Sequence, residues 1–209
     1  MKKLLLLLLF NSLVLQFSFA QETDSSAHHK SWIVHAEVSS FFIPGDFYLN
    51  PLAWVKKNHL HVEARYNYED FETVSFFGGY NFSLGNKLHL DATPMAGFSL
   101  GNTTALLPAA EFELTYWNVG LYGEMEYAIV LNESGSNFFS YWGELYYSPW
   151  EWMWFGMAAQ RIRLNETGLD VQRGPMLALQ RKWFTVTGYY FNPFTDDDFW
   201  MVNMGVTFE

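Results

Sequence analysis

Apolar and polar residues alternate along most of this sequence. In residues 60–65, LHVEAR, the even positions are apolar and the odd positions are histidine, glutamate and arginine. Successive side chains of a strand point to opposite faces, so a period of two predicts a strand with one apolar and one polar face. The same alternation continues through residues 87–99, 109–130 and 199–208, without a helical period of useful length. We therefore predict an all-β protein.

The stretch EFELTYWNVGLYGEMEYAI, residues 111–129, shows how such strands pair. Its apolar residues stand at even positions before Trp117-Asn118 and at odd positions after it. Opposed residues of a hairpin share a face, so a two-residue turn at this dipeptide brings the two apolar sets into register. This register predicts that Glu111 lies opposite Glu124. A three-residue turn around Gly85 is predicted in the same way, and it places Gly79 opposite Asp91.

Eleven segments have the length and pattern of strands: 31–41, 59–68, 73–84, 87–99, 109–117, 119–130, 138–147, 151–163, 168–180, 183–191 and 199–208. A weaker twelfth, 47–58, makes the count even; a barrel of ten with weak segments outside it is the alternative. Each is close to the roughly 9–11 residues that cross a membrane as a tilted strand. Short connections, such as Ser148-Pro149 and Arg181-Lys182, alternate with longer polar loops, as in outer-membrane barrels.

The two faces differ in a way that favours a membrane. Aromatic residues form 20% of the chain, and the apolar face of most strands carries no charge. Tryptophans lie at or near short turns and after one long loop, as expected of two interfacial girdles; they are Trp54, Trp117, Trp150, Trp183 and Trp200. We predict a closed antiparallel up-and-down transmembrane β-barrel over residues 31–209. A soluble exported β-sandwich also alternates and is the other possibility.

The first 30 residues are predicted to lie outside this domain. Residues 1–20 carry Lys2 and Lys3, an apolar run and the small-x-small site Ser18-Phe19-Ala20, which together indicate a cleaved secretory signal peptide. Residues 21–30, QETDSSAHHK, form a polar segment that we expect to be mobile. Cleavage would leave ten basic and 22 acidic residues, a net charge of −12. Nucleic acid is therefore not an expected partner, because phosphate binding needs clustered Lys and Arg.

The last strand, FWMVNMGVTFE, resembles the assembly signal of bacterial outer-membrane β-barrel proteins. In that family the final strand alternates apolar residues and ends in a C-terminal aromatic; Phe208 matches that aromatic, although Glu209 follows it. The resemblance implies a location in the bacterial outer membrane, surrounded by its lipid, and insertion by the barrel-assembly machinery through Phe208. In size the chain is similar to small twelve-stranded porins and outer-membrane enzymes.

Five glutamates on three successive strands are predicted to face one wall of the lumen: Glu111, Glu113, Glu124, Glu126 and Glu144. Like charges at cross-strand distance repel unless cations, arginines or protonation relieve them. They could form a cation-preferring constriction, or a packed interior tied to Arg65, Arg161 or Arg163. Further lumen candidates are His61, Glu63, Arg65, His89 and Asp91.

Catalytic and metal sites are weaker hypotheses. In the predicted register Ser75 pairs near Met95, roughly 20 Å along the strand from His89, which is too far for a nucleophile and its base. His61 with Glu63, and His89 with Asp91, are same-face pairs about 6.6 Å apart, but two residues fall short of a metal site. We predict no enzyme, cofactor or metal.

Some residues do not fit the pattern. Arg173 falls on the apolar phase, where it could snorkel near the outer rim or follow a bulge. Pro94 and Pro175 cannot donate to a ladder, so each predicts a bulge or a local break. The phase of Arg161 and Arg163 is ambiguous.

Together these features favour a porin-like passive channel for small solutes or cations, with the glutamates as its selectivity element. A non-conducting structural or adhesion barrel is the main alternative. An outer-membrane lipid-modifying enzyme is a further one.

Overall fold

The computed structural model describes residues 31–132, 136–162 and 171–209. The signal peptide and polar segment predicted at 1–30 lie outside these ranges. The strands are β1 (Ile33–Ile43), β2 (Asp46–Lys57), β3 (Leu60–Tyr66), β4 (Val74–Tyr80), β5 (Phe82–Leu84), β6 (Leu88–Leu100), β7 (Ala105–Tyr116), β8 (Val119–Val130), β9 (Phe138–Trp150), β10 (Met153–Arg161), β11 (Gln172–Arg181), β12 (Phe184–Phe191) and β13 (Phe199–Phe208).

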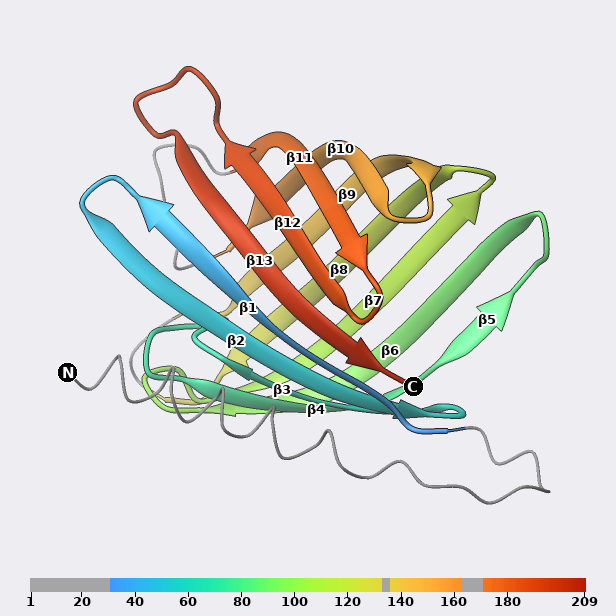
Figure 1. The fold of residues 1–209 in the computed structure, drawn as a ribbon. Helices are drawn as coiled ribbons and strands as arrows, with labels where there is room; N and C mark the ends of the chain where they lie inside the picture. Colours follow the sequence, from blue (N-terminus) through green and yellow to red (C-terminus); the bar gives the residue numbers. More distant parts are fainter. Residues whose placement is uncertain (1–30, 133–135, 163–170) are drawn as a thin grey trace. The chain divides into compact units, whose positions relative to one another are not determined.

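These strands close into an antiparallel barrel. Sequential strands pair with each other except β4 and β5, which both pair with β6, and the first strand β1 pairs with the last strand β13 (Figure 1). Because β4 and β5 both pair with β6, they are two parts of one strand, and the barrel has twelve strands. The predicted fold class and strand number are confirmed, and the ten-stranded alternative is wrong. No helix in the described ranges is long and apolar enough to cross a membrane.

The weak segment at 47–58 is a full member of the barrel. β2 pairs with β1 from Asp46 to Lys56 and with β3 from Leu52 to Lys57. A tight turn follows, in which Asn58 has a φ of 55°, and asparagine tolerates this left-handed conformation better than most residues. The segment looked weak in the sequence because the apolar Leu52 and Trp54 stand on the face that turns inward, where the alternation expects polar residues.

Both prolines that violated the strand pattern mark local breaks. β6 runs without interruption through Pro94, but the neighbouring strand is interrupted between β4 and β5 at Asn81, whose side chain accepts a hydrogen bond from the Thr93 hydroxyl at 2.8 Å. β11 pairs with β12 only from Met176 onward, just after Pro175. A proline lacks the N–H that a ladder needs, so the predicted breaks are confirmed.

The predicted register around Gly85 is wrong. Gly79 lies opposite Met95, and Asp91 lies opposite Ser83. The turn is centred two residues later than predicted, near Lys87. Alternation requires only that paired apolar positions keep the same parity, so this shift leaves every side chain on its predicted face.

The predicted turn at Ser148-Pro149 is also wrong. β9 continues to Trp150, and the turn is Glu151-Trp152. Ser148 and Pro149 together oppose one residue, Trp154, in a β-bulge. A bulge accommodates proline because its extra residue stands outside the ladder.

The outer surface of the barrel is apolar, as the alternation predicts. Exposed large apolar side chains occur on strands all around it, and examples are Val62, Phe98, Leu121, Leu145, Leu177 and Met204. Trp117, Trp150 and Trp183 are exposed at the short turns, and Trp200 is exposed after the long loop 192–198. The placement of Trp54 in this girdle is wrong, because Trp54 faces the lumen and stacks on His35 at 4.9 Å.

The interior holds two apolar clusters as well as polar side chains. One packs Phe41, Tyr48, Phe191 and Phe199 near the loops at the ends of β1 and β12. The other packs buried apolar residues of β4, β6, β7 and β8, namely Phe77, Met95, Ala105, Leu107 and Ala128. The barrel is therefore partly filled by its own side chains, as small barrels commonly are.

Candidate functional site in the barrel lumen

The glutamates of β7, β8 and β9 face the lumen, as predicted. Glu111 and Glu124 lie directly opposite each other across the β7–β8 ladder, and Glu144 pairs with Tyr122 across β8–β9. Glu111, Glu124, Glu126 and Glu144 line one cavity. Glu113 is not part of this lining and accepts a hydrogen bond from the Tyr146 hydroxyl.

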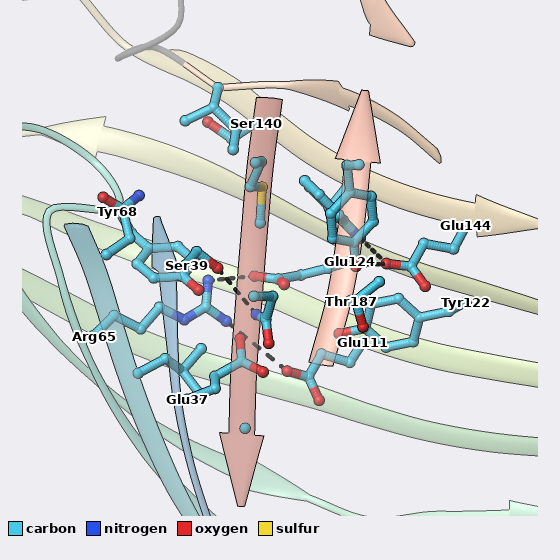
Figure 2. A pocket seen from close by; sticks show the side chains of 18 of the residues that line it. Glu37, Ser39, Arg65, Tyr68, Glu111, Tyr122, Glu124, Ser140, Glu144 and Thr187 are labelled. Atoms are coloured by element: carbon cyan, nitrogen blue, oxygen red, sulfur yellow. Dashed lines mark hydrogen bonds and ion pairs between the residues drawn. The ribbon is translucent and has the colours of Figure 1, made fainter. Parts of the chain in front are cut away.

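Arg65 relieves the repulsion between these carboxylates. From β3 its guanidinium contacts Glu63 on the same strand and Glu124 on β8. It also lies 3.7 Å from a carboxylate oxygen of Glu126 and 4.0 Å from one of Glu111. Figure 2 shows the side chain reaching across the lumen toward the glutamate wall.

Lys56 adds a second positive charge, since its ammonium lies 3.9 Å from Glu111. The glutamates were predicted to form either a cation-preferring constriction or a packed network of ion pairs with arginine. Around Glu111, Glu124 and Glu126 the structure shows the network, with Arg65 at its centre. The fork of a guanidinium suits this position, because it can donate to several carboxylates at once.

The alternation of β3 brings this network together. His61, Glu63 and Arg65 alternate with apolar residues, so all three turn inward and are almost fully buried. His61 Nε2 lies 3.0 Å from a Glu63 oxygen. The Arg65 guanidinium rests on the ring of Phe77 at 4.5 Å and on that of Tyr68 at 5.2 Å, which adds cation–π attraction.

The same cluster contains three groups of the metal-ligating types. Ligand atoms of His61, Glu63 and Glu111 lie within 4.8 Å of one another. However, Glu63 and Glu111 are already held by Arg65, and a guanidinium beside these oxygens opposes a second cation electrostatically. The arrangement fits an ion-pair network better than a metal site.

His89 and Asp91 belong to a separate group. They contact each other at 3.1 Å near the short-turn rim, and their side chains are 39% and 51% exposed. The Ser83 hydroxyl donates to Asp91. The structure therefore brings His61, Glu63 and Arg65 to the glutamate wall but does not bring His89 and Asp91 there.

The structure does not assemble the hydrolytic dyad. Ser75 pairs with Ser99, ten residues along β6 from His89, which corresponds to roughly 33 Å. The two residues are thus farther apart than in the predicted register.

The remaining arginines do not reach the glutamates in the described chain. Arg161 and Arg173 stand at odd-numbered positions, as do the outward-facing residues of β10 and β11. Both arginines are exposed and lie close to the ends of their strands. The outward alternation continues through Arg173 without a shift. This confirms the position near the rim that would let Arg173 snorkel. Arg163 lies outside the described residues.

Two carboxylates of the cavity lining have no lysine or arginine partner among the described residues. Glu144 accepts hydrogen bonds from Trp142 Nε1 at 2.9 Å and from the Tyr189 hydroxyl at 2.7 Å. Glu37, on β1, lies 3.1 Å from His35 Nε2. Sequence reasoning missed Glu37, although it shares the inward parity of His35 and Ser39.

The cavity has a volume of about 340 Å³ and two unlike sides. Carboxylates of β7, β8 and β9 line one side. A row of neutral polar residues across β2, β1, β13 and β12 lines the other: Asn50, Ser39, Asn203 and Thr187. Within this row Asn203 Nδ2 donates to Ser39 Oγ at 3.0 Å. Aromatic side chains, including Trp142, Trp154 and Tyr189, complete the lining.

Comparisons with known proteins identify no family for this chain. No protein-family model matches the sequence, and no curated protein matches it. Among solved structures, it is similar to the crystal structure of Pseudomonas aeruginosa OpdQ, with 11% sequence identity and a TM-score of 0.41. That match covers 88% of this chain and 59% of OpdQ, so the chain spans less than two thirds of the length of OpdQ.

Proposed function

We propose that this protein is an outer-membrane barrel that forms a narrow, cation-preferring passive channel. The apolar outer surface, with tryptophans exposed near both rims, suits lipid surroundings. We also propose that Phe208, the last residue of β13, presents the aromatic that the barrel-assembly machinery recognises. It stacks on Trp183 with the ring centroids 5.7 Å apart, which places it at the short-turn rim.

The charge of the cavity is the observation that carries the proposal. Its lining includes the five glutamates Glu37, Glu111, Glu124, Glu126 and Glu144, whereas Arg65 is the only lysine or arginine among the described lining residues. The formal charge of the lining is therefore five negative against one positive. A passage lined by excess carboxylates raises the local concentration of cations and disfavours anions.

Conductance in planar bilayers tests the channel. Under a KCl gradient we expect a reversal potential that indicates preference for K⁺ over Cl⁻. Glu37→Gln and Glu144→Gln should each reduce this preference, because each removes a carboxylate that no lysine or arginine of the described residues offsets. Glu151→Gln, in the exposed turn between β9 and β10, is the matched control and should leave it unchanged.

The competing function is a non-conducting structural barrel, which the two internal apolar clusters favour. Refolded protein that inserts into bilayers but never conducts would contradict the channel and support this alternative. Conductance whose ion preference survives both glutamate variants would contradict the assigned role of the acidic lining.

A further inference from the structure

We propose that the lumen cavity binds a small organic cation with N–H donors, such as a protonated primary amine. The inference rests on the proposed function, since it concerns the same cavity, but it adds a saturable site and a ligand class. Three independent features of the lining support it: a buried acceptor without a donor, two carboxylates without a lysine or arginine partner among the described residues, and aromatic faces beside them.

The buried acceptor is Asn50 Oδ1. Asn50 is 1% exposed and lines the cavity, and its side-chain oxygen has no hydrogen-bond partner among the described residues. Leaving such an atom without a donor is unfavourable in free energy, because the buried oxygen has lost its hydrogen bonds to water. A ligand that donates an N–H in the cavity would recover this free energy, whereas an alkali cation or a fully methylated ammonium has no N–H to donate.

Glu37 and Glu144 supply the negative charge. The other cavity glutamates, Glu111, Glu124 and Glu126, all lie within 4.0 Å of Arg65. Glu144 instead accepts from the indole and the phenol of Trp142 and Tyr189, which hold its carboxylate in place without cancelling its charge. A cation entering the cavity therefore meets two carboxylates that no lysine or arginine of the described chain neutralises.

The aromatic side chains make the site suitable for an organic cation. Trp142 packs edge-on against Tyr189 at 5.2 Å, and Trp154 also lines the cavity. Indole and phenol rings attract cations over their faces and bury the alkyl part of an organic ligand. The volume, about 340 Å³, is at the lower end of typical small-molecule pockets, which limits the ligand to a small molecule.

Calorimetry on the refolded full barrel in detergent tests the site with three probes. Butylammonium has both charge and N–H donors, butyltrimethylammonium has the charge alone, and butanol has neither charge nor N–H donors. We expect saturable binding of butylammonium, at least about tenfold weaker binding of butyltrimethylammonium, and no binding of butanol. Glu144→Gln and Asn50→Leu should each weaken butylammonium binding about tenfold, and Glu151→Gln should not.

The outcomes separate this inference from the channel. Absence of saturable butylammonium binding would overturn the inference, even if the barrel conducts cations. Equal affinity for the two ammonium probes would also overturn it, because the donor to Asn50 would then contribute nothing. Donor-dependent binding to a barrel that does not conduct would support the site and refute the channel.

Discussion

Arg65 offsets the electrostatic repulsion between the lumen glutamates of β7 and β8. β7 and β8 each place glutamates on the lumen face, and their register sets Glu111 against Glu124. Arg65 comes from β3 and contacts glutamates on both strands while being only 3% exposed. Its removal would leave buried carboxylates without compensation, which is far more costly than losing an exposed ion pair.

We therefore expect Arg65→Met to lower the free energy of unfolding by about 3–5 kcal/mol. The measurement is urea unfolding of the barrel in phospholipid vesicles, followed by tryptophan fluorescence. Arg161→Met removes an exposed, outward-facing arginine and should change stability by less than about 0.5 kcal/mol. Equal stability of the two variants would show that Arg65 does not hold the glutamate wall.

Glu69, in the loop between β3 and β4, gives a prediction about pH. It is 2% exposed, and burial raises the pKa of its carboxyl above 4.5, although the nearby positive charge of Arg65 opposes the shift. The folded protein thus holds this proton more tightly than the unfolded chain. The resulting cost is absent below about pH 4.5 and grows as the pH rises toward the folded pKa.

Glu69→Gln should remove that cost. We expect the variant and the natural protein to have similar stability near pH 4, and the variant to become relatively more stable as the pH increases. Unfolding curves recorded at several pH values check this. A stability difference that is independent of pH would contradict it. Glu72→Gln changes a more exposed carboxylate in the same loop and serves as control.

Among the strands, the β11–β12 hairpin depends on a close approach of two backbones. A Cβ added to Gly174 would overlap the carbonyl oxygen of Tyr190, whereas a Cβ added to Gly188, on β12 of the same hairpin, has no atom within 4 Å. Gly174→Ala should cost about 1–3 kcal/mol, because backbone has to move. Gly188→Ala should be nearly neutral. The same unfolding assay compares them, and equal effects would refute the assigned close approach.

Alternation predicted most of these elements, and the errors have a common cause. Whether a residue number is odd or even within a strand determined which side chains face inward. The predicted pairing of Glu111 with Glu124 was therefore correct, and so was the prediction of a strand at β2. Parity does not distinguish turns that shift the register by whole pairs, so the turn near Gly85 was misplaced. Pro149 was read as a turn signal, although it stands in a bulge.

The site was less predictable than the strands. The inward direction of the glutamates follows from their own strands, but Arg65 and Glu124 are 59 residues apart and meet only because the barrel closes. The same is true of Asn50 and Glu144, which line one cavity from opposite sides. Local periodicity contains no signal for contacts across a lumen, which depend on the strand number and closure.

At the scale of the whole molecule, the proposed location in the outer membrane requires that the outward-facing residues of every strand contact lipid. The chain has no cysteine, so single cysteines can carry spin labels on an otherwise unlabelled background. In vesicles, labels at the outward Leu177 and Met204 should collide more with oxygen, which dissolves in lipid, than with a water-soluble nickel complex. Labels at the lumen positions Ser39 and Thr187 should show low oxygen accessibility. If the nickel complex reaches the outward labels more readily, the outer face is in water, and the barrel is a soluble one.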